Sequence, residues 1–386
     1  MELPASAHHL QGLRVLAFCD YFAAHSSGGA ERVALEVYRR LLLKGGTVEV
    51  LAIQPRASKD VIRVSGIPTH VVPGRDLSRA IGVQMTVAAS ILRIARKVLS
   101  DFKPDVVHVS GIHFLGSLIG AHEAKLHRIP LVVTAHVGSV DALPPAQRLP
   151  ARLYEKLAGH YILTRAAHVI AVSGGVADHV AGLGAKNIHV IPNGVDHQQF
   201  APRQRVHDAQ RVVFVGRLIA NKGPLRALQA YATLRRPEVQ MTFVGDGPMR
   251  KRLEVAAARL GVAGSVEFLG QTDDVSTVLA QSDIFIRPST TEGGLSLSTL
   301  EAMAVGLPVL VSAIAENVAK IDSGVSGILV DPADTKGLAR ELDRLLKDAA
   351  LRRRIGKAGR ALALNHSWET CAEKTVEVLA EAAAGQ

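Results

Sequence analysis

Short apolar runs alternate with amphipathic stretches along nearly the whole chain, and this alternation repeats in two successive series. The apolar runs have the length and β-branched composition of buried strands, and the stretches between them carry apolar residues at helical spacing. Strands that alternate with helices in this way form parallel sheets with helices on both faces. The alternation therefore predicts an α/β fold.

The first series occupies the N-terminal half of the chain. Its predicted strands are Arg14–Cys19, Val48–Ile53, Val106–Val109, Leu131–Thr134, His168–Val172 and His189–Ile191. Its predicted helices are Ala30–Leu43, Thr86–Ser100, Ala151–Arg165 and Gly175–Gly182. Proline and glycine residues separate these elements, as expected for short connections.

A second series follows the polar stretch His197–Gln210, which we interpret as an interdomain linker. Its predicted strands are Arg211–Val215, Gln240–Val244, Val266–Phe268, Ile284–Ile286, Pro308–Val311 and Gly327–Val330. Its predicted helices are Pro224–Leu234, Pro248–Leu260, Asp274–Ala280, Ser298–Val305, Lys336–Lys347 and the final Trp368–Ala383. Because 386 residues exceed one ordinary core, we predict two doubly wound domains with a ligand site at the carboxyl ends of their strands.

Composition narrows the classes of partner. The formal net charge of +10 favours anionic partners such as nucleoside diphosphates or anionic lipid surfaces. Nucleic acid is disfavoured, because aromatic residues are only 4% of the chain and no nucleic-acid-binding motif is present. The two cysteines, Cys19 and Cys371, indicate no disulfide framework. We expect a cytoplasmic protein, because the N-terminus does not resemble a signal peptide and no apolar run reaches ~18 residues.

A glycine pair, Gly28-Gly29, follows the first strand and opens a helix with Glu31 in its first turn. Glycine lets the backbone approach a ligand closely, and a helix start offers free N–H groups to a diphosphate. The same residues also fit a plain turn in which Glu31 interacts with the helix dipole. His136 lies just past the strand Leu131–Thr134, where α/β active sites gather, and fits a structural role as well.

Two cations, Arg217 and Lys222, flank the loop that follows Gly216 in the second domain. Fixed positive charges would stabilise the charge that develops on a departing diphosphate, although lysine and arginine are also common on surfaces. The next strand ends at Gly245-Asp246-Gly247-Pro248. This segment resembles a nucleotide-binding loop, but Arg250 replaces the third glycine of G-x-G-x-x-G, so a tight turn is favoured.

The most informative segment contains Glu292, Gly293 and Gly294 in a loop, and Glu301 on the helix that follows. The glycines can present backbone N–H groups to a phosphate or a sugar. A carboxylate can accept hydrogen bonds from two neighbouring hydroxyls of a sugar ring or ribose. The apolar neighbours of Glu301 indicate that it is not a solvated surface residue.

In order, the chain contains GGAE, IPNGVD, VGRLIANKG, VGDGP and PSTTEGG followed by LEAMAVGLPV. In this order and spacing the motifs resemble the retaining, group 1 glycosyltransferases of family 4, which have the GT-B fold, and the resemblance extends from about Arg14 to the final helix. It implies two Rossmann-like domains that face each other across a cleft. Residues 1–197 would bind the acceptor, residues 198–367 would bind a nucleotide sugar, and the final helix, 368–386, would pack back on the first domain.

The resemblance implies a role for each site residue. Gly28 and Gly29 would approach the donor diphosphate, His136 would lie beside the transferred sugar, and Arg217 and Lys222 would bind the diphosphate. The implied catalytic residues are His136, Arg217, Lys222 and Glu292. The other implied donor-binding positions are Gly216, Gly245, Phe268, Leu269, Gly293, Gly294, Leu295 and Glu301, with the base near Phe268–Gly270 and the ribose on Glu301.

One spacing departs from the family. Glu292 and Glu301 are one position further apart than the usual E-x7-E pattern. Either a one-residue insertion absorbs the difference before the helix starts, or Gly293 fills the usual glutamate position. No Asp-x-Asp motif or matching cluster of ligands indicates a Mg²⁺ site. We therefore predict transfer without a metal or cofactor, with Arg217 and Lys222 supplying the positive charge.

The predicted reaction moves a hexose from a nucleoside diphosphate sugar to a glycan or lipid-linked acceptor in cell-envelope polysaccharide or glycolipid synthesis. The segment Arg148–Arg165 fits either a surface that binds anionic membrane, on the inner face of the cytoplasmic membrane, or an ordinary helix on its sheet. Two alternatives are a non-hydrolysing sugar-nucleotide epimerase and a non-catalytic sugar-nucleotide-binding protein. A dinucleotide-dependent oxidoreductase is disfavoured, because no G-x-G-x-x-G opens either half.

Overall fold

The computed structural model describes residues 12–22, 28–55, 61–76, 86–138, 140, 145–204 and 210–385. The chain divides into two compact units: unit 1 contains Met1–Pro192 and Trp368–Gln386, and unit 2 contains Asn193–Ser367. The division falls at Pro192 rather than at residue 197, because Val195 and Phe200 are buried in the core of unit 2. His197 also belongs to unit 2, where its ring Nε2 lies 3.1 Å from the carbonyl oxygens of Ala363 and His366.

Unit 1 contains one sheet in the order β3-β4-β2-β1-β6-β7-β8-β9, with β5 paired to β4. Strands β3 and β5 are antiparallel to β4, and the others are parallel. The strands are β1 (Arg14–Phe18), β2 (Thr47–Pro55), β3 (Val61–Val64), β4 (Ile67–Asp76), β5 (Thr86–Val87), β6 (Val106–Ser110), β7 (Leu131–Ala135), β8 (His168–Ala171) and β9 (Ile188–Val190). The helices are α1 (Gly29–Leu43), α3 (Ile91–Phe102), α4 (Leu115–His127), α5 (Pro145–Tyr154), α6 (His160–Leu163), α7 (Gly174–Gly182) and α15 (Trp368–Ala384).

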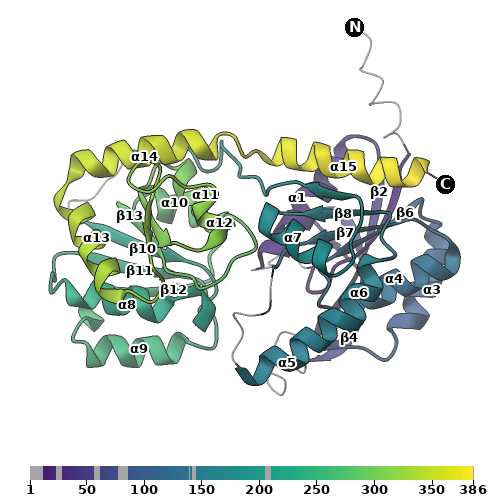
Figure 1. Ribbon diagram of the computed structural model, residues 1–386, viewed down its shortest axis with the longest axis horizontal. Coiled ribbons are helices and arrows are strands. Elements are labelled where there is room, and N and C mark those ends of the chain that lie inside the picture. The colour runs from purple at the N-terminus through teal and green to yellow at the C-terminus, as the bar shows by residue number, and fades with distance from the viewer. Residues whose placement is uncertain are drawn as a thin grey trace, which may run out of the picture. The chain divides into compact units, whose positions relative to one another are not determined.

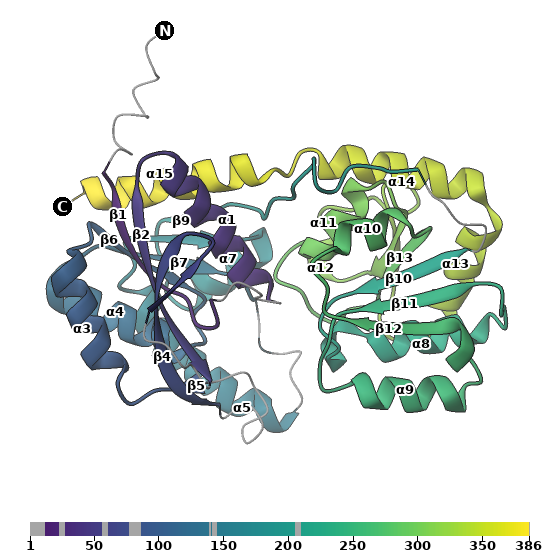
Figure 2. The same ribbon diagram turned by 180° about the vertical axis from the view of Figure 1, so that it is seen from behind.

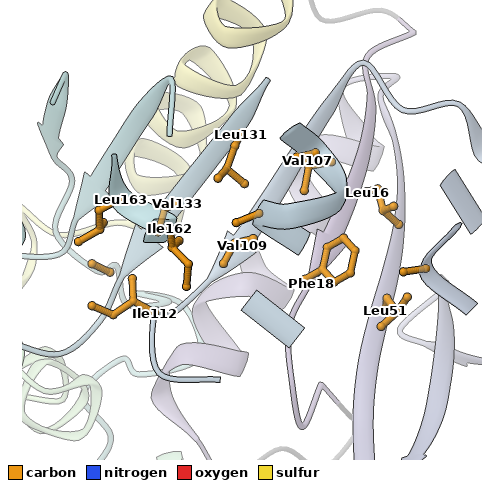
Figure 3. Packing of buried hydrophobic residues seen from close by; sticks show 14 of the residues in the cluster. Leu16, Phe18, Leu51, Val107, Val109, Ile112, Leu131, Val133, Ile162 and Leu163 are labelled. Atoms are coloured by element: carbon orange, nitrogen blue, oxygen red, sulfur yellow. The ribbon is translucent and has the colours of Figure 1, made fainter. Parts of the chain in front are cut away.

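Alternation along the strands of unit 1 sends side chains to two helical layers. Leu16 and Phe18 of β1 pack with Val107 and Val109 of β6 against the layer that contains α3, α4 and α6, and Figure 3 shows these side chains converging on one face of the sheet. Helices α1 and α15 lie on the opposite face (Figure 1). Ion pairs join these two helices, from Arg40 to Glu369 at 2.7 Å and from Lys44 to Glu373 at 3.1 Å.

Unit 2 contains a fully parallel sheet in the order β12-β11-β10-β13-β14-β15. Helices α8, α9 and α13 cover one face, and α10 and α11 cover the other (Figure 2). The strands are β10 (Arg211–Val215), β11 (Gln240–Val244), β12 (Val266–Gly270), β13 (Ile284–Arg287), β14 (Val309–Ser312) and β15 (Ile328–Val330). The helices are α8 (Pro224–Thr233), α9 (Arg250–Arg259), α10 (Val275–Ala280), α11 (Leu297–Ala304), α12 (Ala315–Val318), α13 (Thr335–Lys347) and α14 (Ala349–Ala363), and short 3₁₀ turns lie at Ala220–Lys222 and Ala263–Ser265.

In both units the first strand is central and the strand order reverses beside it, so the predicted class of two Rossmann-like α/β domains is confirmed. Within the described residues, no helix combines the length and the apolar composition that crossing a bilayer requires.

Several elements differ from the prediction. Strands β3 and β4 and helices α4 and α14 lie in regions where the sequence predicts none of them. Helix α4 contains Gly116 and Gly120, which weaken the helical signal. Both glycines are needed for packing: a Cβ at Gly120 would lie 2.8 Å from the ring of Phe18, and one at Gly116 would lie 2.3 Å from Asp20 Oδ1.

Two predicted helices have different bounds. The helix predicted from Thr86 begins at Ile91, because Thr86–Val87 pairs with β4. The helix predicted at Ala151–Arg165 contains a π-helical turn at Glu155–Gly159. That turn directs the buried Glu155 carboxylate to the rings of His113 and His179, at 2.9 and 3.1 Å.

Candidate active site

Doubly wound sheets bind ligands in the crevice outside the carboxyl ends of the strands, at the point where the strand order reverses. In unit 2 this point lies between β10 and β13. Gly216 and Arg217 directly follow β10, and Arg287 is the last residue of β13. The fold therefore brings together two segments that are about seventy residues apart in the sequence.

Glycines allow the loops at this edge to pack in direct backbone contact. A Cβ on Gly245 would lie 2.2 Å from the carbonyl oxygen of Gly216, and one on Gly223 would lie 2.1 Å from the carbonyl oxygen of Pro288. Both glycines also have positive φ, which other residues rarely adopt. The packing of the loop that follows β11 against the loop that follows β10 thus requires Gly245, whether or not Gly245 also contacts a ligand.

A buried ion cluster joins the loops that follow β10 and β13. Lys222 Nζ donates to Glu292 Oε2 at 2.6 Å, and Arg287 Nε and Nη2 lie 3.0 and 2.9 Å from Glu292 Oε1. The Ser289 hydroxyl donates to the same Oε1 at 2.7 Å. Arg287 Nη1 donates to the carbonyl of Val215 at 3.0 Å, which connects the ends of the two strands. The cluster therefore sets the geometry of this edge of the sheet.

The charges of this cluster depend on one another. Burial raises the pKa of Glu292, but the positive charges of Arg287 and Lys222 outweigh burial and hold the pKa at about 2. Burial lowers the pKa of Lys222, and the Glu292 carboxylate raises it. The positive charges of Arg287 and Arg217 lower it as well, so the pKa of Lys222 ends below its ordinary value. Glu292 is therefore an anion at neutral pH, and Lys222, predicted as a diphosphate ligand and a catalytic residue, is also the ion-pair partner of Glu292.

Arg287 is a site residue that the sequence reading does not single out. It is 7% exposed and its guanidinium also bonds the hydroxyl of Ser298 in α11. An arginine that ends an otherwise apolar strand, five residues before a glutamate, is the sequence signal for it.

The helix α11 presents the second glutamate. Glu301 is 5% exposed, in agreement with the apolar flanks that indicate burial. Ser296 caps the helix by accepting a hydrogen bond from the Thr299 N–H at 3.1 Å. Leu295 is 8% exposed and packs in the core, so only its backbone can contact a ligand. Gly293 and Gly294 lie in the loop between Glu292 and this cap.

The predicted base-binding segment at the end of β12 has two carbonyls that accept hydrogen bonds within the protein. Arg250 Nη2 donates to the carbonyl of Phe268 at 3.0 Å, and the Gly245 N–H donates to that of Gly270 at 2.7 Å. The ring of Phe268 stacks on Phe243 with centroids 5.1 Å apart, so it is a packing residue. Leu269 is 40% exposed.

In unit 1, Gly28 is the N-cap of α1 and has extended backbone angles. A Cβ on Gly28 would lie 1.7 Å from Glu31 Oε2, and Glu31 is 8% exposed. The Glu31 carboxylate thus packs against the first turn of its own helix, in the position of a dipole partner. Ser26 and Ser27, which precede this turn, lie outside the described residues.

His136 directly follows β7, and its Nε2 lies 3.0 Å from the hydroxyl oxygen of Ser110 at the end of β6. Burial lowers the pKa of His136 to about 4, so the imidazole is neutral at pH 7. Burial also lowers the pKa of His108 to about 3, and its ring is held by Tyr38 at 2.7 Å and Thr134 at 2.8 Å. A neutral imidazole can orient a sugar hydroxyl through a hydrogen bond without adding charge.

Asp20 is a second residue that the sequence reading does not single out. It follows β1 where the strand order of unit 1 reverses, and it is 3% exposed. Among the described residues no group bonds its Oδ1, while the Gly116 N–H lies 3.4 Å from Oδ2. Burial raises the pKa of Asp20 to about 7. The carboxyl group can therefore exchange a proton near neutral pH.

Two family models match the chain in succession. Residues 27–199 match the model described as Glycosyltransferase Family 4, and residues 195–362 match the model described as Glycosyl transferases group 1. The two matches together extend from residue 27, just before α1, to the end of α14.

Individual relatives are similar over different shares of their length. Sulfoquinovosyl transferase SQD2 of Arabidopsis thaliana is 29% identical, and the match covers 73% of this chain but only 58% of that protein. D-inositol 3-phosphate glycosyltransferase of Salinispora arenicola is 29% identical over 93% of this chain and 88% of that protein. Among solved structures, Anabaena HepE in complex with UDP and glucose is 22% identical, with a TM-score of 0.79 over 95% of this chain and 99% of that chain.

Proposed function

This chain belongs to the group 1 glycosyltransferases of family 4, and on that premise we propose that it transfers a hexose from a nucleoside diphosphate sugar to an acceptor hydroxyl with retention at the anomeric carbon. The observation that carries the proposal is the group of cations at the switch point of unit 2, where Lys222 and Arg287 meet Glu292 beside Arg217. Positive charge at this edge matches the diphosphate of such a donor.

The names of two similar proteins support the donor class. HepE was solved in complex with UDP and glucose, and the Salinispora relative is named D-inositol 3-phosphate glycosyltransferase. The UDP and glucose bound by HepE support a nucleotide sugar as the donor of this chain. We propose a glycan or a lipid-linked glycan as the acceptor, in cell-envelope polysaccharide or glycolipid synthesis.

For the chemical step we propose attack on the same face from which the diphosphate leaves. A double displacement would need a carboxylate nucleophile next to the anomeric carbon. Glu292 is poorly suited, because its two cationic partners lower its pKa to about 2 and with it the nucleophilicity of the carboxylate. The leaving phosphate would instead take the proton of the acceptor, while the neutral His136 orients the sugar.

We propose that Arg217 and Lys222 replace the metal ion that many transferases use to neutralise the leaving diphosphate. Specific donors stabilise the folded state in proportion to their affinity. A thermal-shift comparison of UDP-, GDP- and ADP-hexoses is therefore expected to show one preferred base. With that donor, incubation with an acceptor should yield a product that keeps the anomeric configuration, and EDTA should leave the rate unchanged.

Each of these measurements has an outcome that would contradict part of the proposed function. Loss of transfer in EDTA that Mn²⁺ restores would overturn metal independence, and an inverted product would overturn retention. Conversion of the UDP-sugar without an acceptor would identify an epimerase instead. Donor binding without transfer to any acceptor, and without donor hydrolysis, would identify a sugar-nucleotide-binding protein.

We propose that the chain associates with an anionic membrane, at the inner face of the cytoplasmic membrane, through an exposed surface of unit 1. Leu149, Leu153 and Leu157 follow one another at helical spacing along α5 and the π-helical turn, and they are 76%, 57% and 65% exposed. Arg152 and Lys156 are exposed on the same segment. Exposed leucines beside basic side chains are typical of helices that lie in a membrane interface.

Replacing the three leucines by asparagine is expected to remove most binding to vesicles that contain phosphatidylglycerol, measured by co-sedimentation at low salt. The physical reason is the loss of apolar area that enters the interface, while the positive charge is unchanged. Leu126→Asn, at a leucine that is 56% exposed on α4, is the matched control and should bind as the wild type does. Equal binding by the triple variant, or no binding by the wild type, would rule out this membrane surface.

A further inference from the structure

The register of β8 and β9 directs two histidines to the same face of the unit 1 sheet. The strands are parallel, and Ile170 of β8 pairs with His189 of β9. Side chains alternate along a strand, and Val169 and Ala171 point into the core on the side of α4 and α6. His168 and His189 therefore point to the other face, which α15 covers.

Helix α15 completes a group of three possible ligands. His168 Nδ1 lies 2.9 Å from His189 Nε2, and the two rings are tilted by 48° with centroids 5.1 Å apart. The carboxylate of Glu381, near the end of α15, offers an oxygen within 4.8 Å of the ligand atoms of both histidines. Within the described part of the chain, the Glu381 carboxylate forms no ion pair, so it is available to a cation.

Two of these three side chains adjoin a cavity of about 460 Å³ that is open to solvent. His168 and Glu381 line it, together with Asn187, whose side chain donates to the Ala167 carbonyl at 3.0 Å. The cavity gives an ion and its remaining water ligands access to the group. A carboxylate among the ligands disfavours an anion there, although Arg128 also lines the cavity.

We propose that His168, His189 and Glu381 bind a divalent transition-metal ion of the Zn²⁺ class. Imidazole nitrogens with one carboxylate suit Zn²⁺, Ni²⁺ and Cu²⁺, whereas Mg²⁺ and Ca²⁺ prefer oxygen ligands only. Tetrahedral coordination at ~2.0–2.1 Å places donor atoms roughly 3.3 Å apart. The two histidine nitrogens are 2.9 Å apart and the Glu381 oxygen lies within 4.8 Å of both, so small side-chain rotations bring the three donors to an ion, with water in the fourth position.

The position of this site separates it from the proposed transfer reaction. His168 is the first residue of β8 and the cavity lies at the amino ends of the strands, whereas His136 follows the carboxyl end of β7. The ion would instead link α15 to the β8–β9 edge of the sheet. It would therefore stabilise the attachment of the C-terminal helix and take no part in transfer.

The test is calorimetric titration of the full chain, without a polyhistidine tag, with ZnCl₂ and separately with MgCl₂. One Zn²⁺ per chain and an increase in Tm with Zn²⁺ but not with Mg²⁺ are expected. Glu381→Gln should weaken Zn²⁺ binding by about tenfold or more, since it replaces an anionic ligand with a neutral amide. Glu381 is exposed, so this variant should fold normally.

Two further variants decide the assignment. His189→Ala should abolish the Tm increase with Zn²⁺, and Glu377→Gln, one turn earlier on α15 and also exposed, should leave Zn²⁺ affinity unchanged. Co²⁺ should give the strong visible absorption of tetrahedral coordination in the wild type and lose it in the Glu381 variant. Equal Zn²⁺ affinity in the wild type and Glu381→Gln, or a wild type that binds no Zn²⁺, would overturn the proposal. EDTA-sensitive transfer would count against the proposed function and not against this site.

Discussion

Replacing Arg217 and Lys222 together by alanine is expected to lower kcat for glycosyl transfer by at least about 10³-fold. The negative charge on the diphosphate grows as the glycosidic bond breaks, so fixed cations act more strongly on the transition state than on the bound donor. The effect should therefore appear in kcat and not only in KM. The measurement is a steady-state assay with the donor that the thermal-shift comparison identifies.

The two single variants separate catalysis from structure. Arg217 is exposed, so Arg217→Ala should reduce transfer with little change in Tm. Lys222 is half-buried and bonded to Glu292, so Lys222→Ala should reduce both transfer and Tm, although Arg287 still holds the carboxylate. Lys251→Ala, an exposed lysine on α9, is the control for loss of surface charge. Undiminished transfer by the double variant would end the proposed role of the pair.

Replacing Glu292 by glutamine is expected to destabilise the protein by about 3 kcal/mol at pH 7. The substitution leaves Lys222 and Arg287 close together without the carboxylate that separates their charges. Removing one partner of a buried ion cluster typically costs this much, because the remaining charges stay buried and unpaired. Urea unfolding of the two proteins at constant ionic strength gives the difference.

The same variant has a defined pH signature. The folded pKa of Glu292 is about 2, below the ordinary value of 4.5, so its charged form stabilises the folded state. That stabilisation is fully present above about pH 5 and is lost as the pH falls from about 5 to 2. The wild type should therefore lose stability over this window while Glu292→Gln loses about 3 kcal/mol less, and the two should converge near pH 2.

Glu254→Gln is the matched control. Glu254 pairs with Arg250 at 3.0 Å on the exposed face of α9, and an exposed helical pair contributes only about 0.3–0.5 kcal/mol. Parallel stability curves for wild type and Glu292→Gln between pH 7 and pH 2 would show that the buried cluster contributes no net stability through this charge.

Helices and strands with a clear local signal are predicted correctly from the sequence. Strand β10 is observed at the predicted Arg211–Val215, and α8 begins at the predicted Pro224, because an apolar run and a proline at the first helical position are signals within a few residues. The elements that differ from the prediction are those whose residues favour no single type of secondary structure. Helix α4 carries two glycines that only its contact with Phe18 and Asp20 explains.

In the candidate site, too, some features can be predicted from the sequence and others only from the structure. Glu292, Lys222 and Arg217 stand out from the sequence because glycines and charges at strand ends indicate ligand binding. The ion pair of Lys222 with Glu292, and the bonds from Arg287 to the same carboxylate, cannot be read from the sequence. Their segments are far apart in the chain, and no spacing rule relates them.

The sequence by itself therefore determined the two series of strands and helices, the α/β class and the family, because these depend on short-range periodicity and on motifs in order. The tertiary structure alone decided which charges neutralise one another at the edge of unit 2, and that β8, β9 and α15 bring His168, His189 and Glu381 within reach of one ion. Both groups of side chains depend on how deeply the residues are buried and how far apart they lie. These properties are set only when the strands pair and the helices pack on the sheets.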